Sequence, residues 1–135
     1  VLCTGKIAID LAEALDKPAA DESEEVRDWL HIARVEQLYP FPAEEIGSMI
    51  ERLPALREIC WVQEEPQNMG AWTYMFPRFR KVAPAQTAIR YIGRPERASP
   101  ASGFQQVHSF EQQWIVTQAL TKSRTTQPTG GNGDV

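Results

Sequence analysis

The chain has 135 residues, of which 42% are hydrophobic, and its formal net charge is −4. These values are typical of one globular domain and argue against the basic surface that nucleic acid or an anionic membrane would require. No apolar run approaches the roughly 20 residues of a membrane-spanning helix, and no basic-then-apolar secretory signal opens the chain. We therefore expect neither nucleic acid nor a membrane among its partners.

The first residues predict a strand followed by an amphipathic helix. A short apolar run covers residues 1–4, and Gly5 follows it. Apolar residues then recur from Ala8 to Leu15 at the spacing of one helix face, and Pro18 ends that helix. Because the chain opens on a strand and without Met, we expect Val1 to be a boundary within a longer polypeptide.

Three further strand–helix units follow a polar, acidic loop at residues 18–28. The expected strands are Leu30–Val35, Glu58–Gln63 and Ala88–Ile92. The expected helices begin at Pro42, near Gly70 and near Ser109. The last start rests on Ser109 and Gln112, which have the spacing of a capping box.

The apolar residues of these helices indicate which side chains face the core. The second helix is expected to pack through Ile46, Met49, Ile50 and Leu53. The third is expected to pack through Trp72, Met75, Phe76 and Phe79, with Trp72 as its anchor. The fourth is expected to pack through Phe110, Trp114, Ala119 and Leu120.

Four alternating strands and helices predict an α/β fold. Short apolar strands separated by amphipathic helices are typical of a mostly parallel sheet with helices on both faces, a three-layer α/β/α arrangement. We expect this domain to cover residues 1–124 and residues 125–135 to be a disordered tail, since the tail is rich in Gly and polar residues. Ligands of such folds bind at the carboxyl ends of the strands.

The sequence offers little support for metal or nucleophilic chemistry. Cys3 and Cys60 lie in apolar runs and are expected to be reduced core residues. His31 lies in a predicted strand and is expected to be structural, whereas His108 could contact an anion or lie at the surface. These four residues are scattered over separate elements, so we predict no metal site. Gly5 and Lys6 lack the rest of a phosphate-binding loop and indicate a tight turn.

Two polar segments at strand ends are the stronger candidates for a site. Glu64 and Glu65 follow a buried strand, but adjacent residues point in opposite directions, which favours an interface or structural role over joint acid–base catalysis. The loop from Arg90 to Ser102 is rich in arginine and serine. Such a loop can hold a phosphate, or its arginines can pair with carboxylates elsewhere in a parent protein.

Three segments together resemble a known family. They are VEQLYPFP (residues 35–42), WVQEEPQNMGAW (residues 61–72) and YIGRPERASPASG (residues 91–103), and they occur in this order. Over about residues 1–120 the chain resembles the C-terminal region of the thiamine-dependent, decarboxylating first component of 2-oxoglutarate dehydrogenase complexes. The resemblance implies a fold similar to the transketolase C-terminal domain.

The resemblance also implies a reaction for a parent enzyme. That enzyme would decarboxylate 2-oxoglutarate on thiamine diphosphate and Mg²⁺, then reductively succinylate a lipoyl group of dihydrolipoyl succinyltransferase. The cofactor motifs belong to other domains of the polypeptide, so this chain is expected to hold no cofactor and no catalytic residue. The implied setting is a homodimer in the bacterial cytoplasm or the mitochondrial matrix. A domain or subunit interface is expected at Glu64, Glu65, Asn68 and Trp72.

Some family members respond to acetyl-CoA or an adenine nucleotide. The residues expected to bind such an effector here are Lys81, Arg90, Arg94, Arg97, Ser99 and Ser102. The alternative is that Arg94 and Arg97 pair with carboxylates of other domains or of the second subunit. Two other classes of protein also stay open: a stand-alone nucleotide- or acyl-CoA-binding module, and the equivalent domain of pyruvate dehydrogenase or transketolase.

Overall fold

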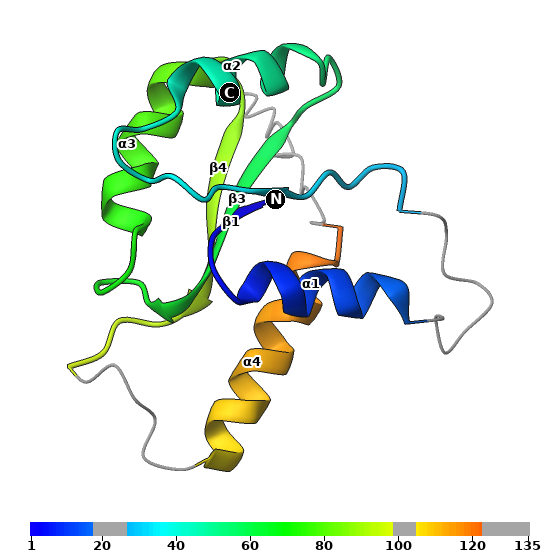
Figure 1. Ribbon diagram of the computed structural model, residues 1–135, viewed down its shortest axis with the longest axis vertical. Helices are drawn as coiled ribbons and strands as arrows, with labels where there is room; N and C mark the ends of the chain where they lie inside the picture. Colours follow the sequence, from blue (N-terminus) through cyan, green and yellow to red (C-terminus); the bar gives the residue numbers. More distant parts are fainter. Residues whose placement is uncertain (18–26, 99–104, 123–135) are drawn as a thin grey trace, which may run out of the picture.

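The computed structural model describes residues 1–17, 27–98 and 105–122 (Figure 1). Its strands are β1 (Leu2–Cys3), β2 (Ala33–Arg34), β3 (Glu58–Pro66) and β4 (Ala88–Arg94). Its helices are α1 (Ile7–Asp16), α2 (Ala43–Glu51), α3 (Trp72–Val82) and α4 (Gln105–Ala119). The predicted acidic loop and the predicted tail lie largely or wholly outside the described residues.

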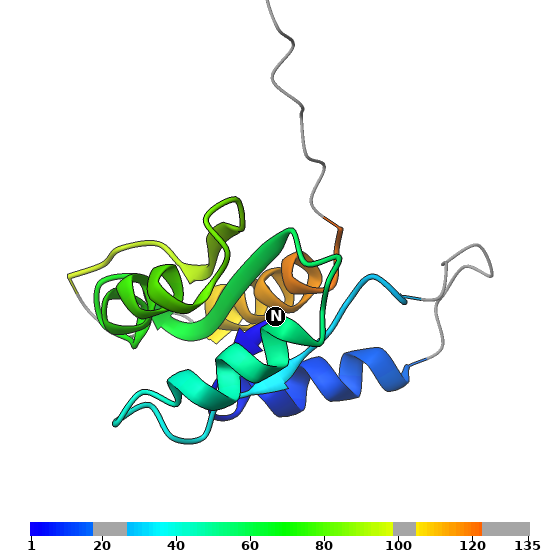
Figure 2. The same ribbon diagram turned by 90° about the horizontal axis from the view of Figure 1, so that it is seen from above.

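The four strands form one sheet in the order β2-β1-β3-β4, and each described pairing is parallel. Helices α1 and α4 cover one face of the sheet, and α2 and α3 cover the other (Figures 1 and 2). The sequence-based expectation of a three-layer α/β/α domain with a parallel sheet is therefore confirmed.

Strand β3 lies in the interior of the sheet and contributes side chains to the hydrophobic cores on both faces, because alternate side chains of a strand point to opposite faces. Cys60 and Val62 pack towards α1 and α4, and Ile59 and Trp61 pack towards α2 and α3. Both cysteines are buried and free, as predicted for core residues. Burial raises the pKa of the Cys60 thiol to about 11, so little of it is the reactive thiolate at neutral pH.

The turn between β1 and α1 depends on Gly5. Its φ of 72° lies in the left-handed region, which glycine enters without a Cβ clash. This turn directs α1 back over the sheet and buries Ile7 and Leu11. The prediction of a tight turn rather than a phosphate-binding loop is consistent with this geometry.

Three local predictions are wrong. The β2 strand has only two paired residues, since its neighbour β1 is itself two residues long, and His31 is exposed outside it. Helix α4 begins at Gln105, so Ser109 lies inside the helix and cannot be its N-cap. The anchors of α3 are the buried Met75 and Phe79, whereas Trp72 is half-buried at the helix start.

Of the four residues expected to pack at α4, Ala119 and Leu120 are buried as predicted, and Phe110 and Trp114 are not. Ile115, Ala119 and Leu120 are buried, but Phe110 is 73% exposed and Trp114 is 46% exposed. Within residues 1–17, 27–98 and 105–122, no helix has both the length and the apolar character needed to cross a membrane.

Candidate functional site

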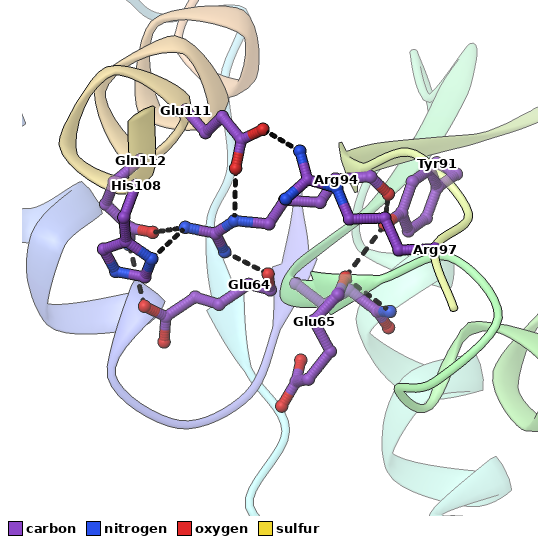
Figure 3. A network of polar contacts seen from close by, with 9 residues as sticks. Glu64, Glu65, Tyr91, Arg94, Arg97, His108, Glu111 and Gln112 are labelled. Carbon is purple, nitrogen blue, oxygen red and sulfur yellow. Dashed lines mark hydrogen bonds and ion pairs between the residues drawn. The ribbon is translucent and has the colours of Figure 1, made fainter. Parts of the chain in front are cut away.

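A buried arginine lies at the carboxyl end of β4, where a parallel α/β sheet places its polar sites. The Arg94 side chain is only 4% exposed and lies between β3 and α4 (Figure 3). Its Nε donates to Glu111 Oε2 at 2.9 Å, and Nη1 donates to the carbonyl oxygen of Glu64. Nη2 lies 3.2 Å from both Gln112 Oε1 and His108 Nδ1. Because a guanidinium only donates, His108 accepts through Nδ1 in this arrangement.

Gln112 extends this network to the first helix. Its Nε2 donates to Asp10 Oδ2 at 2.7 Å and to Glu64 Oε1 at 2.8 Å. Asp10 also pairs with Lys6, at 2.7 Å. Burial acts to raise the pKa of Asp10, but the hydrogen bonds from Lys6 and Gln112 outweigh it and hold the pKa below its usual value. The carboxylate is thus the stable form, and one glutamine joins α4, β3 and α1.

A second part of the network connects two loops at this end of the sheet. Arg97 pairs with Glu111 through its guanidinium, so Glu111 binds two arginines. The backbone N–H of Arg97 donates to Asn68 Oδ1 at 3.1 Å, and Asn68 Nδ2 donates to the Arg97 carbonyl at 2.9 Å. These two bonds hold the loop after β3 against the loop after β4.

A buried glutamine, Gln63, lies near the carboxyl end of β3, on the face of the sheet that packs against α2 and α3. Gln63 is 1% exposed, and its Oε1 accepts from Trp61 Nε1 at 2.8 Å and from the backbone N–H of Trp72 at 3.0 Å. Its Nε2 donates to the carbonyl oxygens of Glu65 and Pro66. A Cβ at Gly70 would lie 2.3 Å from that Nε2, so a larger residue there would displace the Gln63 amide from its hydrogen bonds.

Tyr91, on β4, contacts the backbone at the carboxyl ends of β3 and β4. Its hydroxyl lies 2.7 Å from the Arg94 carbonyl and 3.1 Å from the Glu65 carbonyl. Burial raises the pKa of the Tyr91 hydroxyl to about 12, so it stays protonated and can donate its one proton to either of these carbonyl oxygens. The position therefore fixes loop geometry and is unsuited to acting as a base.

Among the described residues expected to bind an effector, only Arg94 and Arg97 lie together. Arg90 lies on the α1/α4 face of β4 with the buried Ile92. Its Nε pairs with Oε1 of Glu58, on the neighbouring strand β3, at 2.9 Å. Lys81 lies on α3, on the opposite side of the sheet. Arg94 and Arg97 both bind Glu111. The remaining two, Ser99 and Ser102, lie outside the described residues.

The four residues expected at an interface mostly make contacts inside the domain. Glu64 binds Gln112, Asn68 binds the loop after β4, and Trp72 packs against Phe76 and Tyr91, with ring centroids 4.9 and 5.4 Å apart. The exposed Glu65 side chain points away from that of Glu64 (Figure 3), as expected for neighbours at a strand end. Of this set, Glu65 and Asn68 are the most exposed.

This arrangement is suited to holding loops and helices in place. The carboxylates of Glu64, Asp10 and Glu111 are all engaged by cationic or amide groups of the domain. In the part of the chain that the structure describes, no three His, Cys, Asp or Glu side chains are grouped so as to hold a metal ion. The described polar groups of this network thus bind one another.

Sequence patterns place Gln112 only in a capping box, and they do not mark Gln63 or Glu111 as site residues. A signal for Arg94 was present, because it lies two and four residues from Ile92 and Arg90 on the same face of an alternating strand. The glutamines carry no such signal, since a single uncharged amide within an apolar or polar run does not reveal its partner. Asp10 and Gln112, for example, are 102 residues apart.

Comparison with known proteins gives one consistent result. The family model described as 2-oxoglutarate dehydrogenase C-terminal matches residues 1–120. The chain is 55% identical over 122 residues to the 2-oxoglutarate dehydrogenase E1 component of an Exiguobacterium species, 53% to that of Bacillus licheniformis and 49% to that of Bacillus subtilis. Each match covers 90% of this chain and 12% of the relative. The match to the family model and the similarity to these relatives show that the chain belongs to the 2-oxoglutarate dehydrogenase C-terminal family.

Proposed function

We propose that this chain works as the C-terminal structural domain of a 2-oxoglutarate dehydrogenase E1 polypeptide. The parent enzyme would decarboxylate 2-oxoglutarate with thiamine diphosphate and Mg²⁺ and reductively transfer the succinyl group to a lipoyl group. Its partners would be the other domains of the same polypeptide, a second E1 subunit and dihydrolipoyl succinyltransferase.

The observation that carries this proposal is the network around Arg94. In the family match the domain accounts for 12% of each relative, and its polar residues at the strand ends bind one another. A site that bound substrate would need groups directed into open space at that edge. The network instead fixes α4 and two loops, which suits a domain that presents surfaces to the rest of an enzyme.

The described residues do not fit thiamine diphosphate with its cation. A diphosphate-bound Mg²⁺ requires several convergent oxygen ligands, and the carboxylates of the Arg94 network, Asp10, Glu64 and Glu111, are engaged with Lys6, Gln112 and the two arginines. We therefore assign no step of the parent reaction to this chain. Its contribution is the shape and stability of the assembly.

The isolated chain should neither bind thiamine diphosphate nor decarboxylate 2-oxoglutarate. Isothermal titration with thiamine diphosphate and Mg²⁺ should give no saturable heat, and no carbon dioxide should be released. A full-length E1 that contains this domain should do both. Saturable micromolar binding by the 135-residue chain would contradict the proposal, as would a full-length enzyme that does not act on 2-oxoglutarate.

An effector site for acetyl-CoA or an adenine nucleotide is a second proposal, and Arg97 is the residue that favours it. Arg97 is 26% exposed, which leaves part of its guanidinium accessible to a phosphate, whereas Arg94 is enclosed. In the full-length enzyme, Arg97→Ala should weaken activation by acetyl-CoA while basal activity persists. Lys81→Ala tests, by the same measurement, the expected effector-binding residue on α3, on the opposite face of the sheet. Unchanged activation in both variants would remove the effector proposal.

A further inference from the structure

Helix α4 carries an apolar surface, mostly in its N-terminal half, that the described residues leave exposed. Figure 1 shows this half extending past the carboxyl ends of β3 and β4. Val107, Phe110 and Trp114 are 43%, 73% and 46% exposed, and their spacing places them in one row on the helix. The buried residues of α4, Ile115 and Ala119, lie towards its C-terminal end. We call the three exposed residues the α4 apolar row.

The composition of α4 is unusual for a helix that faces water. Among residues 105–119 the only charged side chain is Glu111, and it is bound to Arg94 and Arg97. A solvent-facing helix normally carries charged residues on its outer face. Depletion of charge together with exposed aromatic residues is instead the signature of the core of a protein–protein contact.

The Arg94 network explains why this half of the helix stays in place without an apolar core beneath it. Residues 106–110 are exposed, and His108, Glu111 and Gln112 bind Arg94. Gln112 also reaches Asp10 and Glu64. Hydrogen bonds between buried groups fix direction more strictly than apolar contacts do. The α4 apolar row is therefore held in one orientation, pointing away from the body of the domain.

We propose that the α4 apolar row docks against another domain of the same E1 polypeptide, a proposal that rests on the proposed function. The relatives provide room for such a contact, since this chain covers only 12% of their length. The occupant is expected to be an uncharged, mainly apolar surface with a pocket for the Phe110 ring, because the most exposed aromatic residue is the natural anchor of a contact.

The size of the α4 apolar row favours a tethered domain over a second copy. The three side chains offer on the order of 300 Å², because a whole aromatic side chain buries about 150–250 Å². Each partner of a stable complex buries about 800 Å². A contact of this size is too small to hold two separate molecules together, but it suffices between domains of one chain, where the linkage supplies a high effective concentration.

Hydroxyl-radical labelling of full-length E1, read residue by residue by mass spectrometry, tests the proposal. In the native enzyme at low concentration, Phe110 and Trp114 should be labelled more slowly than in the urea-unfolded enzyme by an order of magnitude or more, because a covered side chain is accessible only through local opening. Native labelling close to the unfolded rate would overturn the proposal. Protection that appears only as the protein concentration rises would also overturn it, since that would indicate contact between copies.

A pair of variants separates docking from a general effect on α4. Phe110→Asp should raise the labelling of Trp114 severalfold, because a carboxylate cannot enter an apolar contact without a large desolvation cost. Gln113→Asp changes another exposed residue of the same helix, and it should leave Trp114 close to the parent value. An equal rise in both variants would count against docking. Activity towards 2-oxoglutarate in the same samples distinguishes the two proposals: an active enzyme with unprotected rings rejects only the docking.

Discussion

Replacing Arg94 by alanine should lower the free energy of unfolding by about 3–5 kcal/mol. The substitution removes the guanidinium that binds Glu111, Gln112 and the Glu64 carbonyl. Glu111 is 18% exposed and would keep only Arg97 as a partner. The cost comes mainly from leaving a partly buried carboxylate and a carbonyl without their donor, and urea unfolding followed by circular dichroism measures it.

Two further substitutions at this site provide the controls. Arg94→Lys keeps the charge but loses the planar fork of donors, so it should recover only part of the stability. Arg97→Ala removes a more exposed partner of the same carboxylate and should cost about 1 kcal/mol or less. If Arg94→Ala were no worse than Arg97→Ala, the network would not be the structural centre that its geometry indicates.

Replacing Phe79 by alanine should cost about 3–5 kcal/mol, for a different reason. Phe79 is fully buried on α3 and packs against Phe41 and Trp61, with ring centroids 6.0 and 5.8 Å apart. Its removal leaves a cavity between α3 and the sheet, because the neighbouring rings are held by their own contacts. The same urea unfolding assay measures the loss.

The matched control for Phe79 is another aromatic residue with no such surroundings. Tyr39 is 82% exposed, so Tyr39→Ala should change the free energy of unfolding by about 0.5 kcal/mol or less. If Phe79→Ala cost as little as Tyr39→Ala, the core facing α2 and α3 would not depend on the Phe79 ring, which would contradict the packing described above.

The alternation of strands and helices along the chain was predictable because its signal is local. Each strand is a short apolar run, and each of the first three helices has an apolar stripe that begins after Gly or Pro, as at Gly5, Pro42 and Gly70. These features depend only on residues near one another in sequence. They led to the correct fold class and the correct order of elements.

The start of α4 and the roles at the strand ends depend on distant partners, and here the sequence was misleading. Ser109 and Gln112 have the spacing of a capping box, but Gln112 is bound to Arg94, Glu64 and Asp10 instead. The sequence pattern predicts that Phe110 and Trp114 lie in the core, because aromatic residues at helical spacing usually pack there. Their exposure follows from where α4 crosses the sheet, which no local pattern records.

The position of α4 at the end of the described chain has a consequence for folding. Ile7 and Leu11 of α1 share their core with Ile115, Ala119 and Leu120 of α4, so the first helix is covered by the last. Contacts over such long sequence separations are slow to form because a large loop must close first. During synthesis from the N-terminus, α1 emerges long before α4, the helix that packs over it. The α1/α4 side of the sheet therefore stays uncovered during synthesis until α4 has emerged.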